Sequence, residues 1–262
     1  MSGALLETKR LHKNFGGLTA VKDFDISVEE GEIRGLIGPN GSGKTTFFNV
    51  ISGYYKPSSG EIRFAGREIQ NMKSDEICKL GMTRTFQGTV LFHEMSVLQN
   101  VYLGAHLQVE SNFFSTLMRT SSYLREEKEI TRRSIELLEY MEIDTLKGEL
   151  AKNLPHGHQR RLGIAIALAP KPKLLLLDEP ITGMNPTEAS NLVALIRKIR
   201  DKMNITVILI DHNMRAVFGI CDKLTVLNHG QKIFEGSPRE VVQNKEVVDA
   251  YLGTAKDTED VF

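Results

Sequence analysis

The chain has 262 residues, 41% of them hydrophobic and 25% charged, as in a globular protein large enough for one sizeable core. Its 33 basic residues balance its 33 acidic residues, so there is no bulk positive field and we expect no nonspecific nucleic-acid binding. The two cysteines, Cys78 and Cys221, lack metal-ligand spacing and suit a reducing compartment. No signal peptide is recognised, and no apolar run approaches the ~18 residues of a membrane span, so work at a membrane would need a partner.

The first elements expected along the chain are strands. Residues 4–11 read as a short strand and residues 15–17 as a turn, while residues 24–28 alternate apolar and polar side chains as a half-buried strand does. Phe15 lies upstream of the glycine-rich segment described next. It is either an aromatic ring placed to stack on a nucleotide base or a half-buried turn residue, and the residues alone leave both open.

A glycine-rich segment joins the apolar run Ile33–Ile37 to a helix-like run at residues 47–53. It fits the pattern G-x-x-x-x-G-K-[ST] of the phosphate-binding P-loop in residues Gly38, Pro39, Asn40, Gly41, Ser42, Gly43, Lys44, Thr45 and Thr46. Glycines let backbone amides approach a polyphosphate, and a helix start adds partial positive charge. Lys44 can reach the β- and γ-phosphates, and the Thr45 hydroxyl can ligate Mg²⁺. The alternative, a strand-to-helix turn carrying Lys-Thr by chance, is disfavoured by the motifs further along.

The middle of the chain predicts a mostly helical subdomain over about residues 90–165. Before this subdomain, a helix is expected at Ser74–Leu80 and a strand at Met82–Phe86. Gln87 follows that strand, at the edge of a parallel sheet where functional residues usually lie. A lone Gln is weak evidence for a functional site. Residues 125–133 are charge-dense and read as a solvated helix face, in which Glu129 and Arg133 are spaced i,i+4. The cluster Phe113–Met118 is either core or a docking surface.

A second motif follows four consecutive leucines. Such a run suits a strand buried on both faces of a parallel sheet, and here it ends in Asp178 and Glu179. Burying two carboxylates at the end of such a strand costs free energy unless they bind a cation or take part in catalysis. Asp178 suits the Mg²⁺ shell beside the P-loop threonine, and Glu179 then faces the water that attacks the γ-phosphate. The alternative is a pair of solvated acids at a strand end.

The last third continues the alternation of strands and helices. Asn185 and Pro186 begin a helix, and a buried strand at residues 205–210 ends in Asp211-His212. A lone histidine there is usually structural, but His212 falls at the same sheet edge as the other motifs, so a phosphate contact is favoured. A capping box at residues 237–240 starts another helix, and residues 254–262 are expected to fray.

Five features follow one another along the chain in an order that resembles the nucleotide-binding subunit of an ABC transporter: the P-loop, Gln87, one further segment, the acidic pair and His212. That segment consists of Leu154, Pro155, His156, Gly157, His158 and Gln159. Finer features are similar to the ATPases of branched-chain amino-acid importers: residues 15–17, 83–87, 91–92, 95–97, 159–162, 183–186 and 250–253. The lipopolysaccharide-export ATPase is a near neighbour through residues 211–215, but residues 84–87 and the Phe113-Phe114 region favour the importer.

The resemblance implies an α/β fold: a P-loop NTPase core of mainly parallel sheet with helices, an N-terminal antiparallel β part and a helical subdomain. It implies a single ABC ATPase domain over residues 4–253 with a flexible tail at 254–262. It also implies roles for individual residues. Phe15 would stack on adenine, Gln87 would touch Mg²⁺ and couple the site to a membrane subunit, Glu179 would be the general base, and His212 would contact the γ-phosphate.

The implied partners are a second ABC ATPase subunit, identical or different, two integral membrane permease subunits and, indirectly, a solute-binding protein. The implied place is the cytoplasmic face of the inner or plasma membrane, with ATP and Mg²⁺ as ligands. In the family two ATPases dimerise head-to-tail, so each ATP lies between one P-loop and the signature segment of the other subunit.

The signature segment departs from the family pattern Leu-Ser-Gly-Gly-Gln. Pro155 stands where the serine would be, His156 replaces the first glycine and His158 the glutamine, and Pro155 offers neither a hydroxyl nor an amide hydrogen. Gly157 and a helix expected at 158–168 still present amides. Asn185 also replaces the usual aspartate after the catalytic glutamate.

The residues favour a transport ATPase over two functions of other classes. A soluble ABC ATPase acting on nucleic acid or ribosomes usually fuses two cassettes or carries coiled coils, whereas this chain has one cassette and a neutral charge balance. A scaffold that binds ATP without hydrolysing it is disfavoured by the intact Asp178-Glu179 pair. The transported solute itself is not readable from these residues.

Overall fold

The computed structural model describes residues 3–85, 91–106 and 121–252, and it divides the chain into two compact units. Unit 1 comprises Met1–Ile77 and Lys173–Phe262, and unit 2 comprises Cys78–Pro172. Gln87, the cluster Phe113–Met118 and the tail 254–262 lie outside the described residues, so the predictions about them stay predictions.

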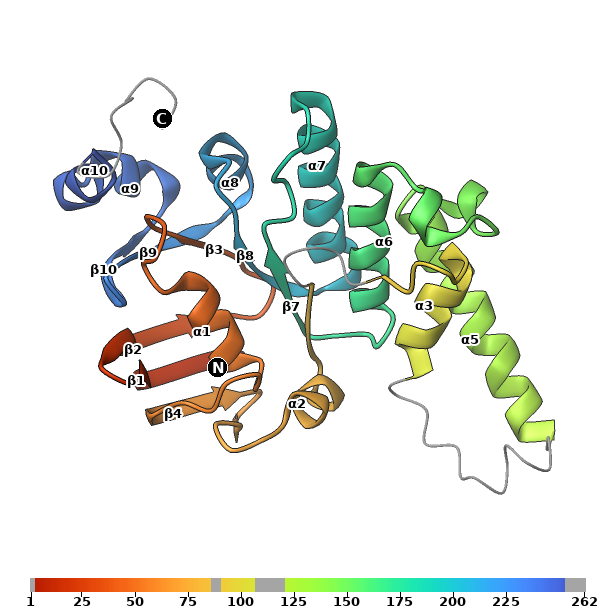
Figure 1. The fold of residues 1–262 in the computed structure, drawn as a ribbon, viewed down its shortest axis with the longest axis horizontal. Helices are drawn as coiled ribbons and strands as arrows, with labels where there is room; N and C mark the ends of the chain where they lie inside the picture. The colour runs from red at the N-terminus through yellow and green to blue at the C-terminus, as the bar shows by residue number, and fades with distance from the viewer. Residues whose placement is uncertain (1–2, 86–90, 107–120, 253–262) are drawn as a thin grey trace. The chain divides into compact units, whose positions relative to one another are not determined.

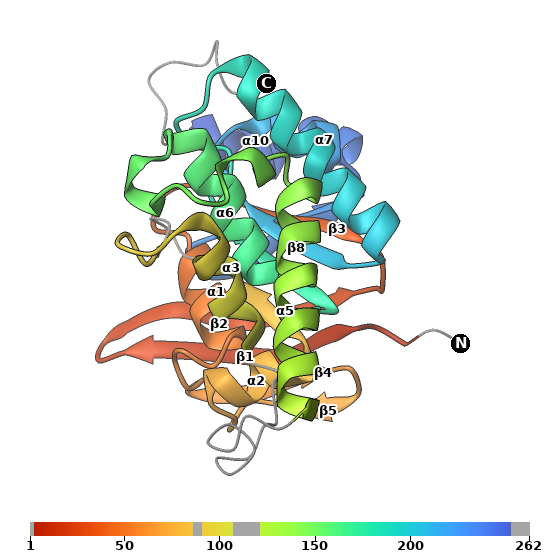
Figure 2. The ribbon, with the colours of Figure 1, turned by 90° about the vertical axis from the view of Figure 1, so that its right-hand side faces the viewer.

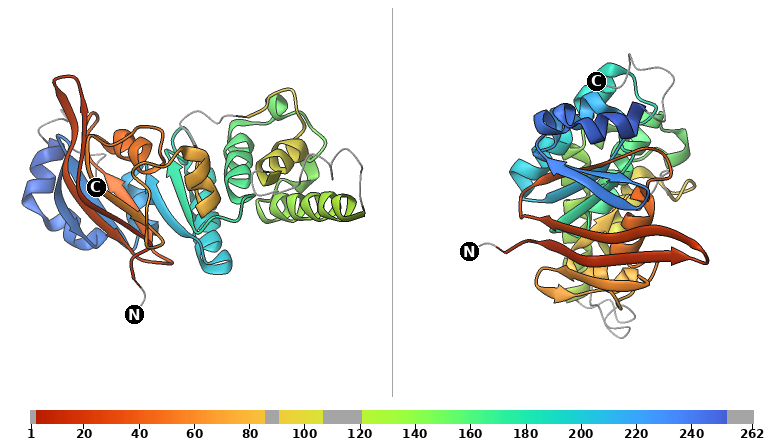
Figure 3. Two further views of the ribbon diagram at one scale, coloured as in Figure 1. Left: turned by 90° about the horizontal axis from the view of Figure 1, so that it is seen from below. Right: turned by 90° about the vertical axis from the view of Figure 1, so that its left-hand side faces the viewer.

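Unit 1 contains an antiparallel sheet built mainly from the N-terminal strands. Its order is β2-β1-β4-β5, formed by β1 (Leu6–Phe15), β2 (Leu18–Val28), β4 (Ser59–Phe64) and β5 (Arg67–Glu68). Leu6 pairs with Val28 and Phe15 with Leu18, so β1 and β2 form one long hairpin (Figure 3). The alternation predicted for residues 24–28 is confirmed, because Phe24, Ile26 and Val28 are buried.

A second sheet in unit 1 is mainly parallel. Its unit-1 strands run in the order β10-β9-β3-β8-β7, namely β3 (Ile33–Ile37), β7 (Leu174–Asp178), β8 (Thr206–Ile210), β9 (Lys223–Asn228) and β10 (Gln231–Gly236). Strands β3, β7 and β8 are parallel and buried along their whole length, as the apolar runs predicted. Their carboxyl ends therefore meet at one edge, and the chain leaves that edge through the P-loop, the acidic pair and His212.

Helices complete unit 1: α1 (Lys44–Ile51), α7 (Pro186–Met203), α8 (Met214–Ile220), α9 (Pro238–Gln243) and α10 (Lys245–Leu252), with α2 (Ser74–Leu80) at the boundary (Figure 1). The predicted caps are confirmed, because Asn185 and Ser237 form capping boxes at α7 and α9. In α7 the buried stripe includes Ala189 and Ile199, whereas Met203, in the last turn, is only half-buried.

Unit 2 is mostly helical, as predicted. Its elements are β6 (Met82–Arg84), α3 (Val97–Ala105), α5 (Ser121–Tyr140), the 3₁₀ turns η2 (Asp144–Leu146) and η3 (Ala151–Asn153), and α6 (His156–Leu168). Helices α3, α5 and α6 pack on one another (Figure 2). The charge-dense face of α5 is exposed, and the predicted i,i+4 pair forms, with Arg133 Nε 2.6 Å from Glu129 Oε1.

Several element boundaries differ from the sequence prediction, and three of them have a clear local cause. Strand β1 continues to Phe15 because it pairs with β2 up to the turn. Helix α1 begins at Lys44 instead of residue 47, since Gly43 takes a left-handed conformation that turns the loop directly into the helix. Helix α6 begins at His156 instead of His158, because Pro155 has the extended backbone of a helix N-cap, with φ −55° and ψ 151°.

Candidate nucleotide-binding site

The P-loop follows β3 and leads into α1 beside the β1–β2 hairpin (Figure 1). Two of its glycines have no room for a side chain. A Cβ at Gly38 would lie 2.1 Å from the carbonyl oxygen of Leu227, and one at Gly43 would lie 2.3 Å from that of Ala20. Gly43 also has φ +104°, which L-residues with side chains rarely adopt. The loop is thus held close to the backbone of two neighbouring strands.

We expect Gly43→Ala to destabilise the fold by about 2–4 kcal/mol, because it combines an unfavourable φ with a backbone collision. Gly41→Ala is the matched control, since Gly41 has φ +78° but no atom within 4 Å of its Cβ position, and its cost is about 1–2 kcal/mol. Urea unfolding of both variants measures the difference. Equal losses would mean that the contact with Ala20 does not constrain the loop.

Lys44, the first residue of α1, is buried with its charge turned toward the loop. Its Nζ donates hydrogen bonds to the carbonyl oxygens of Gly38 at 2.7 Å and Pro39 at 2.9 Å. Burial lowers the pKa of Lys44, while the nearby charges of Glu179 and Asp178 act in the opposite direction. The ammonium therefore lies between the P-loop and the acids at the end of β7, which brings two predicted groups together.

The acidic pair occupies the end of β7. Asp178 is 1% exposed and is the last residue of the strand. Glu179 has φ +49°, an uncommon value for a residue with a side chain, and its amide donates to the carbonyl of Ile210 at 2.8 Å. This turn directs the chain away from the strand, and the Glu179 side chain keeps 15% of its surface exposed. A partly exposed carboxylate beside a buried one suits proton transfer to or from water.

His212 contacts the acidic pair directly. Its Nε2 lies 2.8 Å from Oε1 of Glu179, and 45% of the side chain is exposed. The two residues follow neighbouring parallel strands, β7 and β8, so the register of the sheet creates their contact. The sequence placed both at one sheet edge but did not predict that they touch.

Asp211 is a buried residue whose function the sequence reasoning missed. Its Oδ2 accepts from the amide of Ile181 at 2.8 Å and its Oδ1 from that of Asn213 at 2.9 Å. The carboxylate therefore joins the loop after Glu179 to the loop that carries His212. Burial raises the pKa of Asp211, although hydrogen bonds from the amides of Asn213, Ile181 and His212 oppose that shift. Only 1% of the Asp211 surface is exposed, and this burial marks the residue as important. Burial of this kind cannot be read from the sequence.

The raised pKa of Asp211 predicts how the stability of the fold changes with pH. The folded protein holds the Asp211 proton more tightly than the unfolded chain does. Protonation of Asp211 therefore adds to the free energy of unfolding, and this contribution is complete at pH below 3.8, the ordinary pKa of an aspartate. The contribution is lost as the pH rises through the higher pKa that Asp211 has in the folded protein. The unfolding free energy of the parent relative to Asp211→Asn should thus increase as pH falls from neutral towards 4. Urea unfolding at both pH values measures it, and a constant or opposite difference would contradict the assignment.

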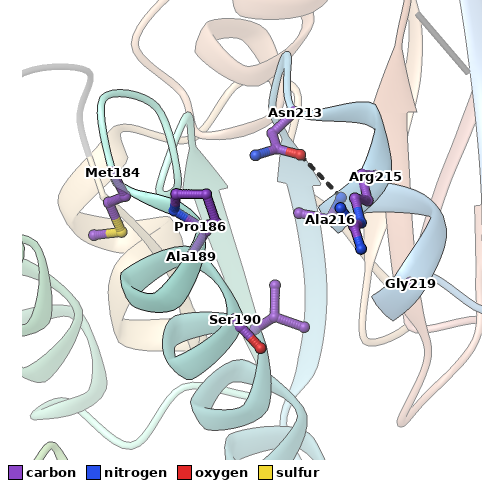
Figure 4. A pocket seen from close by; sticks show the side chains of 9 residues that line it. Met184, Pro186, Ala189, Ser190, Asn213, Arg215, Ala216 and Gly219 are labelled. Atoms are coloured by element: carbon purple, nitrogen blue, oxygen red, sulfur yellow. Dashed lines mark hydrogen bonds between the residues drawn. The ribbon is translucent and has the colours of Figure 1, made fainter. Parts of the chain in front are cut away.

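Beside these loops lies a separate cavity of about 370 Å³ between the starts of α7 and α8. Figure 4 shows the lining residues Met184, Pro186 and Ser190 on the α7 side of the cavity and Asn213 and Arg215 on the α8 side. Asn213 caps α8 by accepting from the amide of Ala216 at 3.0 Å. None of the P-loop residues lines this cavity, so it is distinct from the candidate phosphate site.

Two features are absent from the part of the chain that the structure describes. No described helix is long and apolar enough to cross a membrane. Within those same residues, no group of three or more His, Cys, Asp and Glu side chains comes together as a metal site.

Comparison with known proteins identifies the family. The profile of the ABC transporter family matches residues 21–182, and that of the branched-chain amino acid ATP-binding cassette transporter family matches residues 231–257. The chain belongs to the ABC transporter ATP-binding family. It is 40% identical to the high-affinity branched-chain amino acid transport ATP-binding proteins BraF of Pseudomonas aeruginosa and LivG of Escherichia coli, over 97% of this chain and 100% of each relative.

The fold agrees with this assignment. A crystal structure of the ADP conformation of an ATP-binding cassette of an ABC transporter superposes with a TM-score of 0.83 and 31% identity, over 95% of this chain and 99% of that one. The predicted P-loop α/β fold is thereby confirmed. This ABC ATPase subunit hydrolyses ATP and couples hydrolysis to transport, as predicted.

In the ABC ATPase the altered signature segment lies in unit 2, at the start of α6. Leu154 is buried, and Gln159 closes the turn by donating from Nε2 to the carbonyl of Leu154 at 2.9 Å. Pro155 and His156 are exposed. The segment is thus an ordinary helix start in which two departures from the family pattern face outward.

A contact from the C-terminal part of the ABC ATPase reaches the P-loop. Tyr251, on α10, lies within the segment matched by the branched-chain profile, and its hydroxyl lies close to the backbone of Gly38. Burial raises the pKa of Tyr251. In sequence, residues 250–253 carry only a resemblance to the family, and no local pattern indicates that Tyr251 lies beside the P-loop.

Proposed function

We propose that this ATPase subunit powers the import of branched-chain amino acids or of a related small polar solute. The relatives named above are branched-chain amino acid transport proteins, which supports import over the export alternative. The proposal for how the subunit hydrolyses ATP rests on one observation: the carboxyl ends of three neighbouring strands lie side by side. Lys44, the acidic pair and the His212–Glu179 contact all lie at the carboxyl edge of β3, β7 and β8.

The P-loop would bind the triphosphate of ATP. Backbone amides from Gly38 to Thr46 would surround the phosphates, and Lys44 would exchange its contacts with the Gly38 and Pro39 carbonyls for phosphate oxygens. The base would stack on Phe15, whose ring is 41% exposed at the end of β1. Gln87, expected beside the metal, lies outside the described residues.

Glu179 would be the general base. Water attacks the γ-phosphorus, its proton passes to the Glu179 carboxylate, and the bond from the γ-phosphorus to the bridging oxygen of ADP breaks. His212, 2.8 Å from Glu179, would hold that carboxylate in place and contact the γ-phosphate. Both side chains retain exposed surface, which the approach of water and phosphate requires.

Mg²⁺ fits the residues present. The Thr45 hydroxyl is exposed at the start of α1, and the Asp178 carboxylate lies near Lys44. Both are hard oxygen donors of the kind that Mg²⁺ prefers, and Mg²⁺ usually completes its shell with water and substrate phosphate. When bound, the ion would neutralise negative charge on the β- and γ-phosphates.

The proposed assembly contains a second ABC ATPase, two permeases and a solute-binding protein, with this subunit at the cytoplasmic face of the inner membrane. Reconstitution of that assembly in proteoliposomes tests it. ATP hydrolysis should be stimulated by leucine-loaded binding protein and accompanied by leucine uptake. Stimulation without uptake of any branched-chain amino acid would reject the solute class while leaving the ATPase assignment intact.

Because Pro155 and His156 replace the serine and first glycine of the signature, we expect the two sites of a heterodimer to differ. The site that uses this chain's P-loop and the partner's signature should be the faster one. Glu179→Gln in this chain should then cost more ATPase activity than the equivalent substitution in the partner. Equal losses in the two assemblies would contradict the asymmetry.

A further inference from the structure

Phe15 projects from the end of β1 with 41% of its surface exposed, and the turn after it has two glycines. An exposed aromatic ring at the tip of a hairpin has little of its own strand to hold it. A ring that receives a nucleotide base must nevertheless keep one orientation, since stacking depends on the angle between the two planes. The structure shows what holds it.

Two side chains surround Phe15. The ring of Tyr55 meets that of Phe15 edge-on, with centroids 5.2 Å apart and an interplanar angle of 78°. The Nζ of Lys13 lies 4.8 Å from the Phe15 centroid and 5.5 Å from the Tyr55 centroid. The ammonium and the two rings therefore form a compact triangle, and both ring–ring and cation–ring geometry are in the attractive range.

The triangle is anchored to the backbone on both sides. Lys13 Nζ donates to the carbonyl of Lys56 at 2.8 Å, so the ammonium is fixed over the rings. The amides of Tyr54 and Tyr55 both donate to the carbonyl of Asn49 at 2.9 Å. Asn49 belongs to α1, the helix that starts at Lys44. One end of this short helix thus carries the phosphate-binding lysine, and the other end holds the ring that contacts Phe15.

We propose that Tyr55 and Lys13 are positioning residues of the base site, which hold the Phe15 ring in the orientation that receives adenine. The inference rests on the proposed function, in which Phe15 stacks on the base. Because α1 links Tyr55 to the P-loop, the spacing between base platform and phosphate loop is set by one rigid element. Neither residue belongs to the P-loop, so their effect should appear only with ligands that carry a base.

The test compares ATP with inorganic tripolyphosphate, which lacks the base, by calorimetric titration of the purified full chain. Tyr55→Ala should weaken ATP binding about 2- to 10-fold and leave tripolyphosphate binding unchanged. Lys13→Met should weaken ATP binding about 2- to 5-fold with the same selectivity. Tyr55→Phe, which keeps the ring, should bind ATP like the parent.

Tyr54→Ala is the matched control. Tyr54 is 63% exposed and contacts Tyr55 at 5.1 Å, but it forms no ring contact with Phe15. It should leave the ratio of the two affinities unchanged, and thermal unfolding midpoints verify that each variant is folded. Equal weakening of ATP and tripolyphosphate by Tyr55→Ala, or no weakening of either, would overturn the inference.

The proposed function fails in a different way. If the parent protein binds tripolyphosphate as tightly as ATP, Phe15 makes no contact with the base. The roles proposed for Tyr55 and Lys13 would then be wrong as well. The phosphate site is tested independently by Lys44→Ala, which should weaken both ligands. A base-selective loss with Tyr55→Ala, together with a loss of both ligands with Lys44→Ala, supports the two proposals separately.

Discussion

Glu179→Gln is expected to lower the rate of ATP hydrolysis by about 10²- to 10⁴-fold while ATP still binds. Glutamine has nearly the same shape as glutamate, so the turn at φ +49° persists, and the backbone amide of residue 179 still donates a hydrogen bond to the carbonyl of Ile210. Its amide cannot accept a proton from water, which removes the general base. The contact with His212 remains possible in a weaker form, so the local structure is retained.

Steady-state phosphate release and equilibrium ATP binding together test this prediction. Glu139→Gln is the control, because Glu139 is an exposed carboxylate on α5, far along the chain from the acidic pair. It should leave both measurements unchanged. A Glu179→Gln protein that hydrolyses ATP at the parent rate would show that another group takes the proton. One that no longer binds ATP would show that Glu179 acts in binding instead.

The elements with the strongest local signals were predictable from sequence. The strands β3, β7 and β8 read as apolar runs because they are buried on both faces, and the capping boxes at Asn185 and Ser237 need only residues three positions apart. The P-loop was recognisable because its backbone requires glycines at fixed places, and Gly38 and Gly43 leave no room for a Cβ. Each of these signals is local in the chain.

The features that could not be predicted from the sequence depend on contacts between segments that lie far apart in the chain. Arg34 interrupts the apolar run of β3, yet it is buried, because its guanidinium pairs with Glu235 at 3.1 Å and donates to Thr225 at 2.9 Å. Asp211 looked like part of a strand end, but it accepts amides from two loops. No local pattern encodes the partners Glu235, Thr225 and Ile181, since each lies 30 or more residues away along the chain.

The site shows the same division between local and distant information. Lys44, Asp178, Glu179 and His212 were named from motifs, and the structure brings Lys44, Glu179 and Asp178 within electrostatic reach and His212 onto Glu179. The supporting contacts of Tyr55 with Phe15 and of Tyr251 with Gly38 were not foreseen. They come from segments that carry no motif for catalysis, and their roles follow from packing alone.

Lys44→Ala is expected to weaken ATP binding by at least about 100-fold, because charge-assisted hydrogen bonds to phosphate contribute ~1.5–3 kcal/mol each and one ammonium donates several. The side chain is only 6% exposed and already points at the loop carbonyls of Gly38 and Pro39, so it is pre-oriented for the phosphates. Truncation also leaves the Asp178 and Glu179 charges without the ammonium that stands near them. Two anions would then face an anionic ligand.

Lys22→Ala is the control for this substitution. Lys22 is an exposed lysine on β2, and its amide donates to Gly230, which in turn donates to the carbonyl of Ser42 in the P-loop. The control thus removes one positive charge from the neighbourhood of the loop without touching the phosphate contacts. ATP affinity should be nearly unchanged in Lys22→Ala and strongly reduced in Lys44→Ala. If both variants bind ATP like the parent, the backbone amides alone hold the triphosphate, and Lys44 has a structural role in closing the loop.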